Sequence, residues 1–431
     1  MITKGKKKEI FLSLLKQRLK ESFLLVEVYL LGLCILGFLE IMLKNREKHA
    51  FDTLCQVHRS SRIKWLRQFV EPTITRHMYL THEVMAAGNP TKSPVEPYFG
   101  NRILVLKPPK KGEKGVLYIM FSELFKLIPA MFEMGKLLKS YSLVLEPSWS
   151  GYCDEDIMHF TKYKEEIFVL SPEKEDYNFL KRLHTNLIPL PIGSRDWVDP
   201  TLYDRSKGYL EKKVYDIVMN SHWGWLKRHH VLFEALRKLD PKIRVVLIGF
   251  PWQGRNSEDV KELARYYHVD EQITIYDSIP YEDVIRITSQ SKIGVLLSLK
   301  EGSNRAISEC LFCNVPGIVL SENIGGVKGV IGPKTGMNVP SRNLVPSIEY
   351  MLEHLSSYEP RRWALENISC AVTTTRLNAF LRERAEVRGE PWTTDIVPKA
   401  NAPESKYFHE GDEIKLKEYN FKLKEYLVHR G

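Results

Sequence analysis

The sequence predicts an α/β protein built of two doubly wound domains. Two stretches of the chain alternate short apolar runs with helical patterns, and a polar stretch with little hydrophobic period separates them. The runs of the second stretch are apolar on both faces, as covered parallel strands are. The 431 residues, 43% of them hydrophobic and 27% charged, suffice for two domains that each bury a core.

The first 48 residues combine a basic segment with an apolar one. Residues 23–42 are long enough to cross a hydrocarbon core of about 30 Å as a helix, with Glu27 and Glu40 near the two ends. Residues 1–120 hold 21 Lys and Arg against 10 Asp and Glu, whereas the rest holds 42 against 43. This pairing favours an anionic membrane surface over nucleic acid as a partner. We expect residues 1–48 to dip into or cross a membrane with the body on its cytoplasmic face; a buried core helix is the alternative.

The first α/β domain is expected at residues 49–200, with a helix beginning near Glu123. A polar linker follows at residues 201–213. The expected strands of the first domain lie at 116–121, 143–146, 167–170 and 186–190.

The cysteines are scattered, which is typical of reduced thiols in a cytoplasm. The CxxC of Cys310 and Cys313 lacks a second pair of ligands to complete a zinc site.

The second α/β domain is expected at residues 214–385, before a tail at 386–431 that packs back on the protein. Ligands of doubly wound sheets bind at the carboxyl ends of the strands, so we expect the site between the two domains. The expected strands lie at 214–219, 243–249, 273–276, 292–297 and 316–320.

One strand of the second domain leads into a sequence suited to binding phosphate. Glu301 falls just past the strand, and Ser303 or Asn304 can cap the helix that follows. The backbone amides at Gly302, Ser303 and Asn304 and the helix dipole would favour a diphosphate by about 0.3 to 2 kcal/mol. Glu309 lies roughly 9 Å further along the helix, which suits ribose hydroxyls, and leaves Glu301 to contact the sugar.

Two further groups complete the expected donor site. Lys227 and Arg228 stand at a strand-to-helix loop, where each would contribute about 1.5 to 3 kcal/mol to binding a leaving diphosphate. Gly325 and Gly326 permit close backbone approach to a ligand, although an ordinary turn would also use them.

The seven residues between Glu301 and Glu309 resemble the E-x(7)-E motif of retaining glycosyltransferases of the GT-B type, family 4-like, also called glycosyl transferases group 1. The following VPGIVL strand and SENIGGVKGVI loop keep that family's order. The resemblance implies two Rossmann-like domains that face a cleft, a nucleotide-sugar donor, a hexosyltransferase-type reaction with retention of configuration, and a phosphate contact for Lys227. Three positions depart from the family: Ser221 replaces an Arg, and Arg228 and Asn314 each replace a Gly.

The acceptor side is expected in the first domain, where LVLEPSWSGYCDED ends a strand. Glu146, Ser148 and Trp149 are the candidates there, and Trp149 can stack on a ring. We expect a glycan or lipid-linked acceptor and, because no DxD-like pair is apparent, neither metal nor cofactor. A GT-B epimerase or phosphorylase, and an inactive nucleotide-sugar-binding scaffold or sensor at the membrane, are the alternatives.

Overall fold

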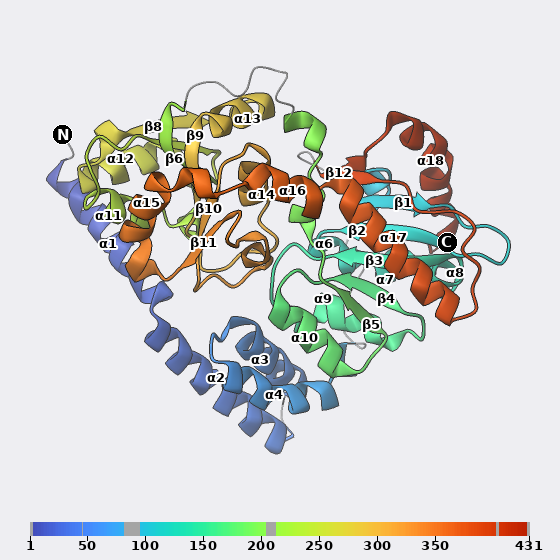
Figure 1. Ribbon diagram of the computed structural model, residues 1–431. Coiled ribbons are helices and arrows are strands. Elements are labelled where there is room, and N and C mark those ends of the chain that lie inside the picture. The colour runs from blue at the N-terminus through green and yellow to red at the C-terminus, as the bar shows by residue number, and fades with distance from the viewer. Residues whose placement is uncertain (1–2, 45, 82–94, 204–212, 402–404, 429–431) are drawn as a thin grey trace. The chain divides into compact units, whose positions relative to one another are not determined.

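The computed structural model describes residues 3–44, 46–81, 95–203, 213–401 and 405–428. The chain divides into two compact units, each built around an α/β sheet (Figure 1), which confirms the predicted fold class. Most of the linker predicted at residues 201–213 lies outside the described residues. Unit 1 comprises Met1–Leu19 and Arg195–Val372, and unit 2 comprises Lys20–Ser194 and Thr373–Gly431.

Unit 1 contains a sheet of six parallel strands in the order β11-β10-β9-β6-β7-β8. The order reverses between β6 and β9, which is where doubly wound sheets bind ligands. The five predicted strands of this domain match β6 to β10 to within two residues at each end, whereas β11 was not predicted. The strands are β6 (Tyr215–Asn220), β7 (Val245–Gly249), β8 (Ile273–Asp277), β9 (Ser291–Leu296), β10 (Gly317–Leu320) and β11 (Gly336–Val339).

Helices and a large apolar core complete unit 1. The N-terminal helix α1 (Lys4–Glu21) packs here: Ile10 and Leu14 are buried in the core, and Lys6 Nζ lies 3.1 Å from Glu262 Oε2. The sequence predicted no such docking of a basic helix. The other helices are α11 (His229–Leu236), α12 (Ser257–Tyr267), α13 (Tyr281–Ser289), α14 (Arg305–Phe312), α15 (Leu344–Glu353) and α16 (Pro360–Asn367).

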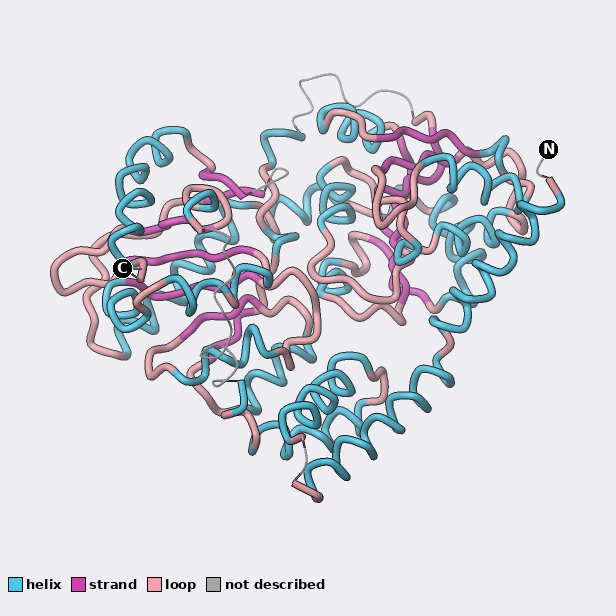
Figure 2. The backbone as a smooth tube through the Cα atoms, turned by 180° about the vertical axis from the view of Figure 1, so that it is seen from behind, coloured by secondary structure: helices cyan, strands magenta, loops and turns pink. Residues whose placement is uncertain are grey.

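Unit 2 contains a five-stranded sheet in the order β1-β2-β3-β4-β5. The four predicted strands of this domain correspond to β2 to β5, which are parallel, as predicted. The remaining strand, β1, is antiparallel to β2 because a short hairpin joins them. The strands of this sheet are drawn in magenta in Figure 2. They are β1 (Ile103–Lys107), β2 (Gly115–Met120), β3 (Tyr141–Glu146), β4 (Ile167–Leu170) and β5 (Leu187–Leu190).

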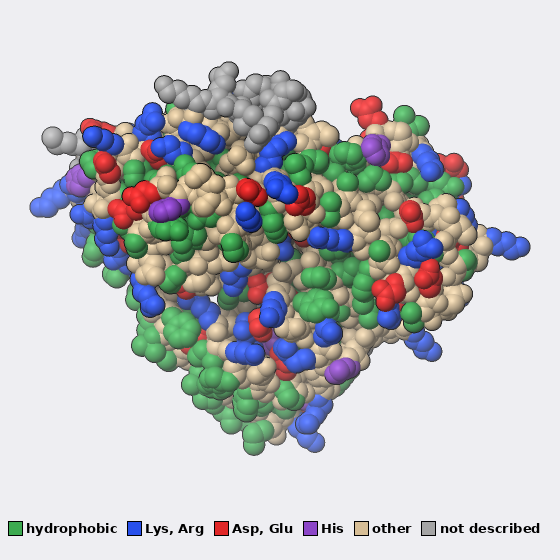
Figure 3. All heavy atoms as spheres, viewed as in Figure 1, with side chains coloured by type: hydrophobic (Ala, Val, Ile, Leu, Met, Phe, Trp, Pro, Cys, Tyr) green, Lys and Arg blue, Asp and Glu red, His purple; other side chains and the backbone are tan. Residues whose placement is uncertain are grey.

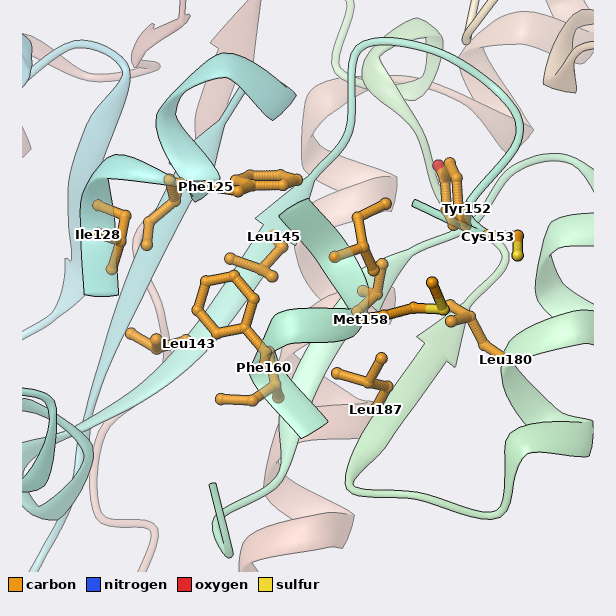
Figure 4. Close-up of a cluster of buried hydrophobic side chains, with 14 of the residues drawn as sticks. Phe125, Ile128, Leu143, Leu145, Tyr152, Cys153, Met158, Phe160, Leu180 and Leu187 are labelled. Carbon is orange, nitrogen blue, oxygen red and sulfur yellow. The ribbon is translucent and has the colours of Figure 1, made fainter. Parts of the chain in front are cut away.

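The core of unit 2 forms between this sheet and its short helices (Figure 4). Leu143 and Leu145 of β3 lie among aromatic side chains, and the rings of Phe125 and Phe160 meet edge to face with centroids 6.4 Å apart. The expected helix near residue 123 is broken into three short helices. The helices are α6 (Ser122–Phe125), α7 (Leu127–Met131), α8 (Met134–Ser140), α9 (Glu155–Met158) and α10 (Lys174–Leu183).

The apolar stretch predicted at residues 23–42 is the helix α2 (Phe23–Met42), which begins at the N-cap Ser22. One of its faces packs on α3 (Glu47–Ser60), where Gly37 lies so close that a Cβ would stand 2.9 Å from Leu54 Cδ2. Glu27 is buried, and its carboxylate accepts hydrogen bonds from Ser61 Oγ and the Arg62 N–H, each at 2.6 Å. A third helix, α4 (Lys64–Arg76), packs on α3.

The other faces of α2 are exposed, and only 22% of its apolar window is buried. Figure 3 shows hydrophobic side chains gathered over this helix. The alternative prediction of a buried core helix is therefore wrong for α2, because only one of its faces packs on other helices. The exposed apolar side chains of α2 are Phe23, Leu24, Leu25, Val28, Tyr29, Leu31, Ile35, Leu36, Leu39 and Met42.

The C-terminal part of the chain belongs to unit 2. It comprises α17 (Cys370–Val387), the antiparallel pair β12 (Lys399–Asn401) and β13 (Ser405–Tyr407), and α18 (Glu410–Lys422). The Val105 N–H donates to Asn420 Oδ1 at 3.1 Å, and Tyr407 Oη donates to the Val105 carbonyl at 3.0 Å. These side chains thus satisfy backbone groups of the edge strand β1.

Candidate active site

The helix N-terminus predicted to bind phosphate follows β9 in unit 1. Asn304 is the N-cap of α14: its side chain accepts a hydrogen bond from the Ile307 N–H at 3.3 Å. This confirms one of the two predicted caps. Ser303, which precedes it, is buried. The first backbone N–H groups of α14 therefore lie beside the turn formed by Glu301 and Gly302, as the sequence predicted.

Glu301 forms a buried ion pair with Lys227. Lys227 Nζ lies 2.5 Å from Glu301 Oε1, and Ser298 Oγ donates to the same oxygen at 2.6 Å. The two charged side chains are 9% and 7% exposed. Two buried charges are stable together because each compensates the other. A ligand that replaces one partner must therefore bring a charge of the same sign as that partner.

A glycine-containing loop runs against this turn. The Glu301 N–H donates to the Ile324 carbonyl at 2.8 Å, and the Gly326 N–H donates to the Gly302 carbonyl at 2.9 Å. A Cβ on Gly325 would stand 2.9 Å from the Glu301 carbonyl oxygen. The close approach expected of these glycines is therefore made to the backbone of the Glu301 turn.

Glu309, the second glutamate of the motif, is held inside α14 by two donors. Tyr281 Oη and Arg305 Nε each lie 3.0 Å from Glu309 Oε1. The hydroxyl of Tyr203 lies 2.7 Å from that of Tyr281. Burial raises the pKa of Tyr281, so it stays protonated and can donate to the carboxylate.

The loop after β6 places Lys227 at the site through an unusual backbone. Lys227 ends a short 3-10 turn, and the next residue, Arg228, has φ 59°, in the left-handed region that favours glycine. The glycine that the resemblance implies at this position would fit this backbone. Arg228 Nη1 donates to the Leu297 carbonyl at 3.0 Å, and Ser221 Oγ lies 3.3 Å from His229 Nε2.

His222 adds a neutral ring to the same loop. Burial, reinforced by the positive charge of Lys227, lowers the pKa of His222 to about 4. Its Nδ1 accepts the Gly224 N–H at 3.1 Å, so the proton resides on Nε2. The ring stacks on Trp252 with centroids 5.2 Å apart. A neutral hydrogen-bond donor therefore stands near the Lys227–Glu301 pair.

The predicted acceptor-side residues lie in unit 2 in three different environments. Glu146 is 2% exposed at the end of β3 and accepts a hydrogen bond from Tyr118 Oη. Ser148 is half-buried and exchanges hydrogen bonds with Ser122, at 3.0 and 3.1 Å. Trp149 is 48% exposed. Of the three, Trp149 presents the most surface to a ligand.

The CxxC cysteines are buried in the apolar side of α14. Burial raises the pKa of both thiols, that of Cys313 to about 12, so neither is a thiolate at neutral pH. Within the described ranges, no group of three or more His, Cys, Asp or Glu side chains is placed to hold a metal ion.

The sequence did not single out two side chains that position the glutamates. Ser298 lies three residues before Glu301, and Tyr281 opens the helix after β8. Position was the only available signal: each follows the carboxyl end of a predicted strand, at the edge where ligands bind.

Residues 204–366 match the family described as glycosyl transferases group 1. The predicted family resemblance is confirmed for this segment. The group 1 domain thus covers the sheet of unit 1, the Lys227–Glu301 pair and α14. The two Rossmann-like units and the apolar N-terminal helix agree with the predicted GT-B class. No curated protein matches the chain significantly.

Several solved structures resemble the fold at low identity. Sucrose-phosphate synthase from Thermosynechococcus elongatus is 16% identical over 73% of this chain and 80% of its own, with a TM-score of 0.47. HepE from Anabaena, in complex with UDP, is 12% identical over 70% and 82%, with a TM-score of 0.48. A mutant of S. aureus TarM, in complex with fondaparinux, alpha-GlcNAc-glycerol and UDP, is 12% identical over 61% of this chain, with a TM-score of 0.46. The match spans about half of TarM, 55% of its chain.

Proposed function

We propose that this protein is a retaining, hexosyltransferase-type glycosyltransferase that uses a nucleotide-sugar donor bound by unit 1. The observation that carries the proposal is the buried Lys227–Glu301 pair beside the N-terminus of α14, inside the segment that matches the group 1 family. A cation, a carboxylate and the N-terminal amides of a helix meet there, and these are the groups that bind a sugar diphosphate.

In this proposal the donor displaces the internal pairing of the site. The diphosphate replaces Glu301 as the ion-pair partner of Lys227 and accepts hydrogen bonds from the first N–H groups of α14. Glu301 then accepts a hydrogen bond from a hydroxyl of the transferred sugar. Tyr281 and Arg305 hold Glu309 through Oε1, so its Oε2 is assigned to the ribose hydroxyls. Binding thus exchanges one set of charge-assisted hydrogen bonds for another.

The transfer step breaks the bond between the anomeric carbon and the diphosphate oxygen, and that oxygen keeps the electron pair. The acceptor oxygen bonds to the anomeric carbon on the same face, and the acceptor proton passes to a phosphate oxygen of the leaving nucleotide. Lys227 and the amides of α14 stabilise the developing negative charge. Since these groups act without a metal, we propose metal-independent turnover, which full activity in EDTA would support.

The acceptor is proposed to be a glycan, free or lipid-linked, that contacts Glu146, Ser148 and Trp149 of unit 2. The exposed apolar side chains of α2 support a membrane location (Figure 3). We propose that the body of the protein lies on the cytoplasmic face of that membrane. Vesicle flotation tests this part. Val28→Glu should reduce binding of the full chain to phosphatidylglycerol vesicles, whereas Ile414→Glu, at an exposed apolar position of α18, should not.

The deciding experiment measures nucleotide release from a panel of nucleotide sugars by the purified chain supplied with a membrane extract. Glu301→Gln and Lys227→Ala should each reduce turnover by about 100-fold or more. Glu258→Gln and Lys261→Ala, which alter an exposed ion pair of the same unit, are the matched controls and should retain activity. Turnover unaffected by both site variants would reject the proposal.

An inactive scaffold or sensor is the second candidate, favoured by Ser221 at the position where the family has arginine. It predicts that the wild type binds a nucleotide sugar without turnover on any acceptor in the extract. Isothermal titration identifies the donor that binds best. A turnover assay with that donor then separates the two functions, because binding is common to both and turnover is not.

A further inference from the structure

Arg195 is a buried cation with an unused donor. It opens the second segment of unit 1, is 6% exposed, and donates from Nε to Asp196 Oδ1 at 3.1 Å. Among the residues that the structure describes, its Nη1 is buried without a hydrogen-bond partner. Buried guanidinium groups normally satisfy their N–H donors, so this one indicates a missing acceptor.

The position of Arg195 identifies where that acceptor would lie. Its backbone N–H donates to Ser303 Oγ at 3.1 Å, and Ser303 precedes the N-cap of α14. Its Nη2 lies so near Gly329 that a Cβ there would be 3.0 Å away. Gly329 belongs to the 3-10 turn Gly326–Val330, whose first N–H donates to Gly302. The guanidinium therefore borders the glycine loop, while the backbone of the same residue is bonded to the residue that precedes the N-cap of α14.

The other polar groups of the site compensate only part of the charge that a diphosphate would bring. Lys227 is shared with Glu301, Arg228 donates to the Leu297 carbonyl, and Ser221, with its hydroxyl at His229, carries no charge. A nucleoside diphosphate brings about two negative charges or more, and one lysine offsets only part of them.

We propose that Arg195 is an anion-binding residue of the donor site, whose guanidinium contacts the diphosphate together with Lys227 and the amides of α14. This inference rests on the proposed function and names a residue of the same site that lies before the group 1 segment. A purely structural Arg195–Asp196 pair is the competing explanation. The two explanations differ in the role of Asp196. If Arg195 binds an anion, Asp196→Asn removes a competing negative charge and leaves the affinity for diphosphate equal or higher.

The test is isothermal titration of the full chain with UDP, GDP, ADP and inorganic pyrophosphate. Arg195→Gln should weaken binding of the best nucleotide and of pyrophosphate by about 10- to 100-fold, and Arg195→Lys, which keeps the charge, by less. Arg237→Gln makes the same change at an exposed position of unit 1 and should have no effect. If Arg195→Gln does not fold, Arg195→Lys and Asp196→Asn carry the comparison.

The outcomes distinguish failure of the Arg195 inference from failure of the proposed function. Unchanged affinity in Arg195→Gln and Arg195→Lys, with thermal stability lowered as much as in Asp196→Asn, would overturn the inference and leave the glycosyltransferase proposal intact. Wild-type binding of pyrophosphate but of no nucleotide, lost in Arg195→Gln, would support the anion site and reject the nucleotide-sugar donor. Binding of none of the four probes by the wild type would overturn both.

Discussion

Each unit has a buried glutamate at or beyond the carboxyl end of a parallel strand, yet the two glutamates have different surroundings. Glu301 in unit 1 is paired with Lys227 and Ser298, beside a helix N-terminus and a glycine loop. Glu146 in unit 2 ends β3 and is bonded to Tyr118 of the neighbouring strand. The same residue type thus has a lysine as its direct partner beside helix amides in unit 1, whereas in unit 2 it is bonded to a tyrosine whose ring centroid lies 4.3 Å from the buried Lys399 Nζ.

The difference shows that strand position alone does not identify a catalytic carboxylate. A buried charge becomes exchangeable when its partner can also bind a ligand, as an ammonium group can bind phosphate. A tyrosine hydroxyl carries no charge to exchange in this way. The comparison predicts that substitutions at Glu301 and Lys227 change donor chemistry, whereas substitutions in unit 2 change stability or acceptor use.

The largest expected effect is on the stability of the unit 1 pair. Lys227→Ala leaves a buried carboxylate with the hydroxyl of Ser298, so the free energy of unfolding should fall by about 3 kcal/mol. Adding Glu301→Gln to the same chain removes the uncompensated charge and should restore part of the loss. Urea denaturation of the two variants measures this coupling. Lys261→Ala, at an exposed pair, should change stability by less than about 0.5 kcal/mol.

A pH titration extends the comparison to a structural carboxylate of unit 2. Burial alone would raise the pKa of Glu71, but hydrogen bonds from His58 and Arg182 lower it to about 2. A depressed folded pKa stabilises the fold above the unfolded value and loses this effect as pH falls from about 4.5 to about 2. The full shift corresponds to about 3 kcal/mol, which partial solvent screening reduces to about 1 to 2.

Urea denaturation between pH 2 and pH 5 measures that contribution. Glu71→Gln should flatten the acid limb of the stability curve, while Glu418→Gln, exposed on α18, should leave it unchanged. An identical acid limb in wild type and Glu71→Gln would show that ionisation of Glu71 does not stabilise unit 2.

A smaller effect is expected at Glu146. Glu146→Gln replaces a charge-assisted hydrogen bond from Tyr118 by a neutral one, so the free energy of unfolding should fall by about 1 kcal/mol. Titration with the donor nucleotide should give an unchanged affinity. A 100-fold loss of turnover with intact donor binding would instead show that Glu146 acts on the acceptor. Glu146 would then be a functional carboxylate like Glu301, and the comparison would fail.

The smallest stability effect is expected at Trp149, which is half exposed. Trp149→Ala should change the free energy of unfolding by less than about 0.5 kcal/mol. If the indole stacks on the acceptor, the apparent KM for the acceptor should rise by about tenfold while the KM for the donor stays constant. Steady-state kinetics with each substrate varied in turn distinguishes the two, and Trp65→Ala, exposed on α4, is the matched control.

The sequence was informative where burial dictates residue type. The run IFVL matches β4 residue for residue, and α2 has the predicted bounds, because two-sided burial and a long apolar helix leave unmistakable patterns. The amphipathic helices α3 and α4 and the edge strand β1 were missed. Their pattern depends on which neighbour covers them, and in β1 the side chains that bond the Val105 backbone come from residues more than 300 positions later.

The donor site could be predicted as far as its local geometry reaches. Asn304 caps α14, and Asn314 takes the left-handed conformation with φ 58° at the helix end, as its residue type suggested. The pairing of Lys227 with Glu301 joins two loops 74 residues apart. Arg195 reaches the site from a segment 108 residues before Ser303. Contacts of this kind depend on strand order, which periodicity does not encode.

The path of the chain has a consequence for how the protein is made. The backbone passes from unit 1 to unit 2 after Leu19, returns at Arg195 and leaves again after Val372, so neither unit is a continuous stretch of polypeptide. A ribosome that has synthesised residues 20–194 has not yet made Tyr407 and Asn420, which complete the hydrogen bonding of β1. Neither half can therefore be expressed alone by cutting the gene once, and the first unit to receive all its segments during synthesis is the one with the donor site.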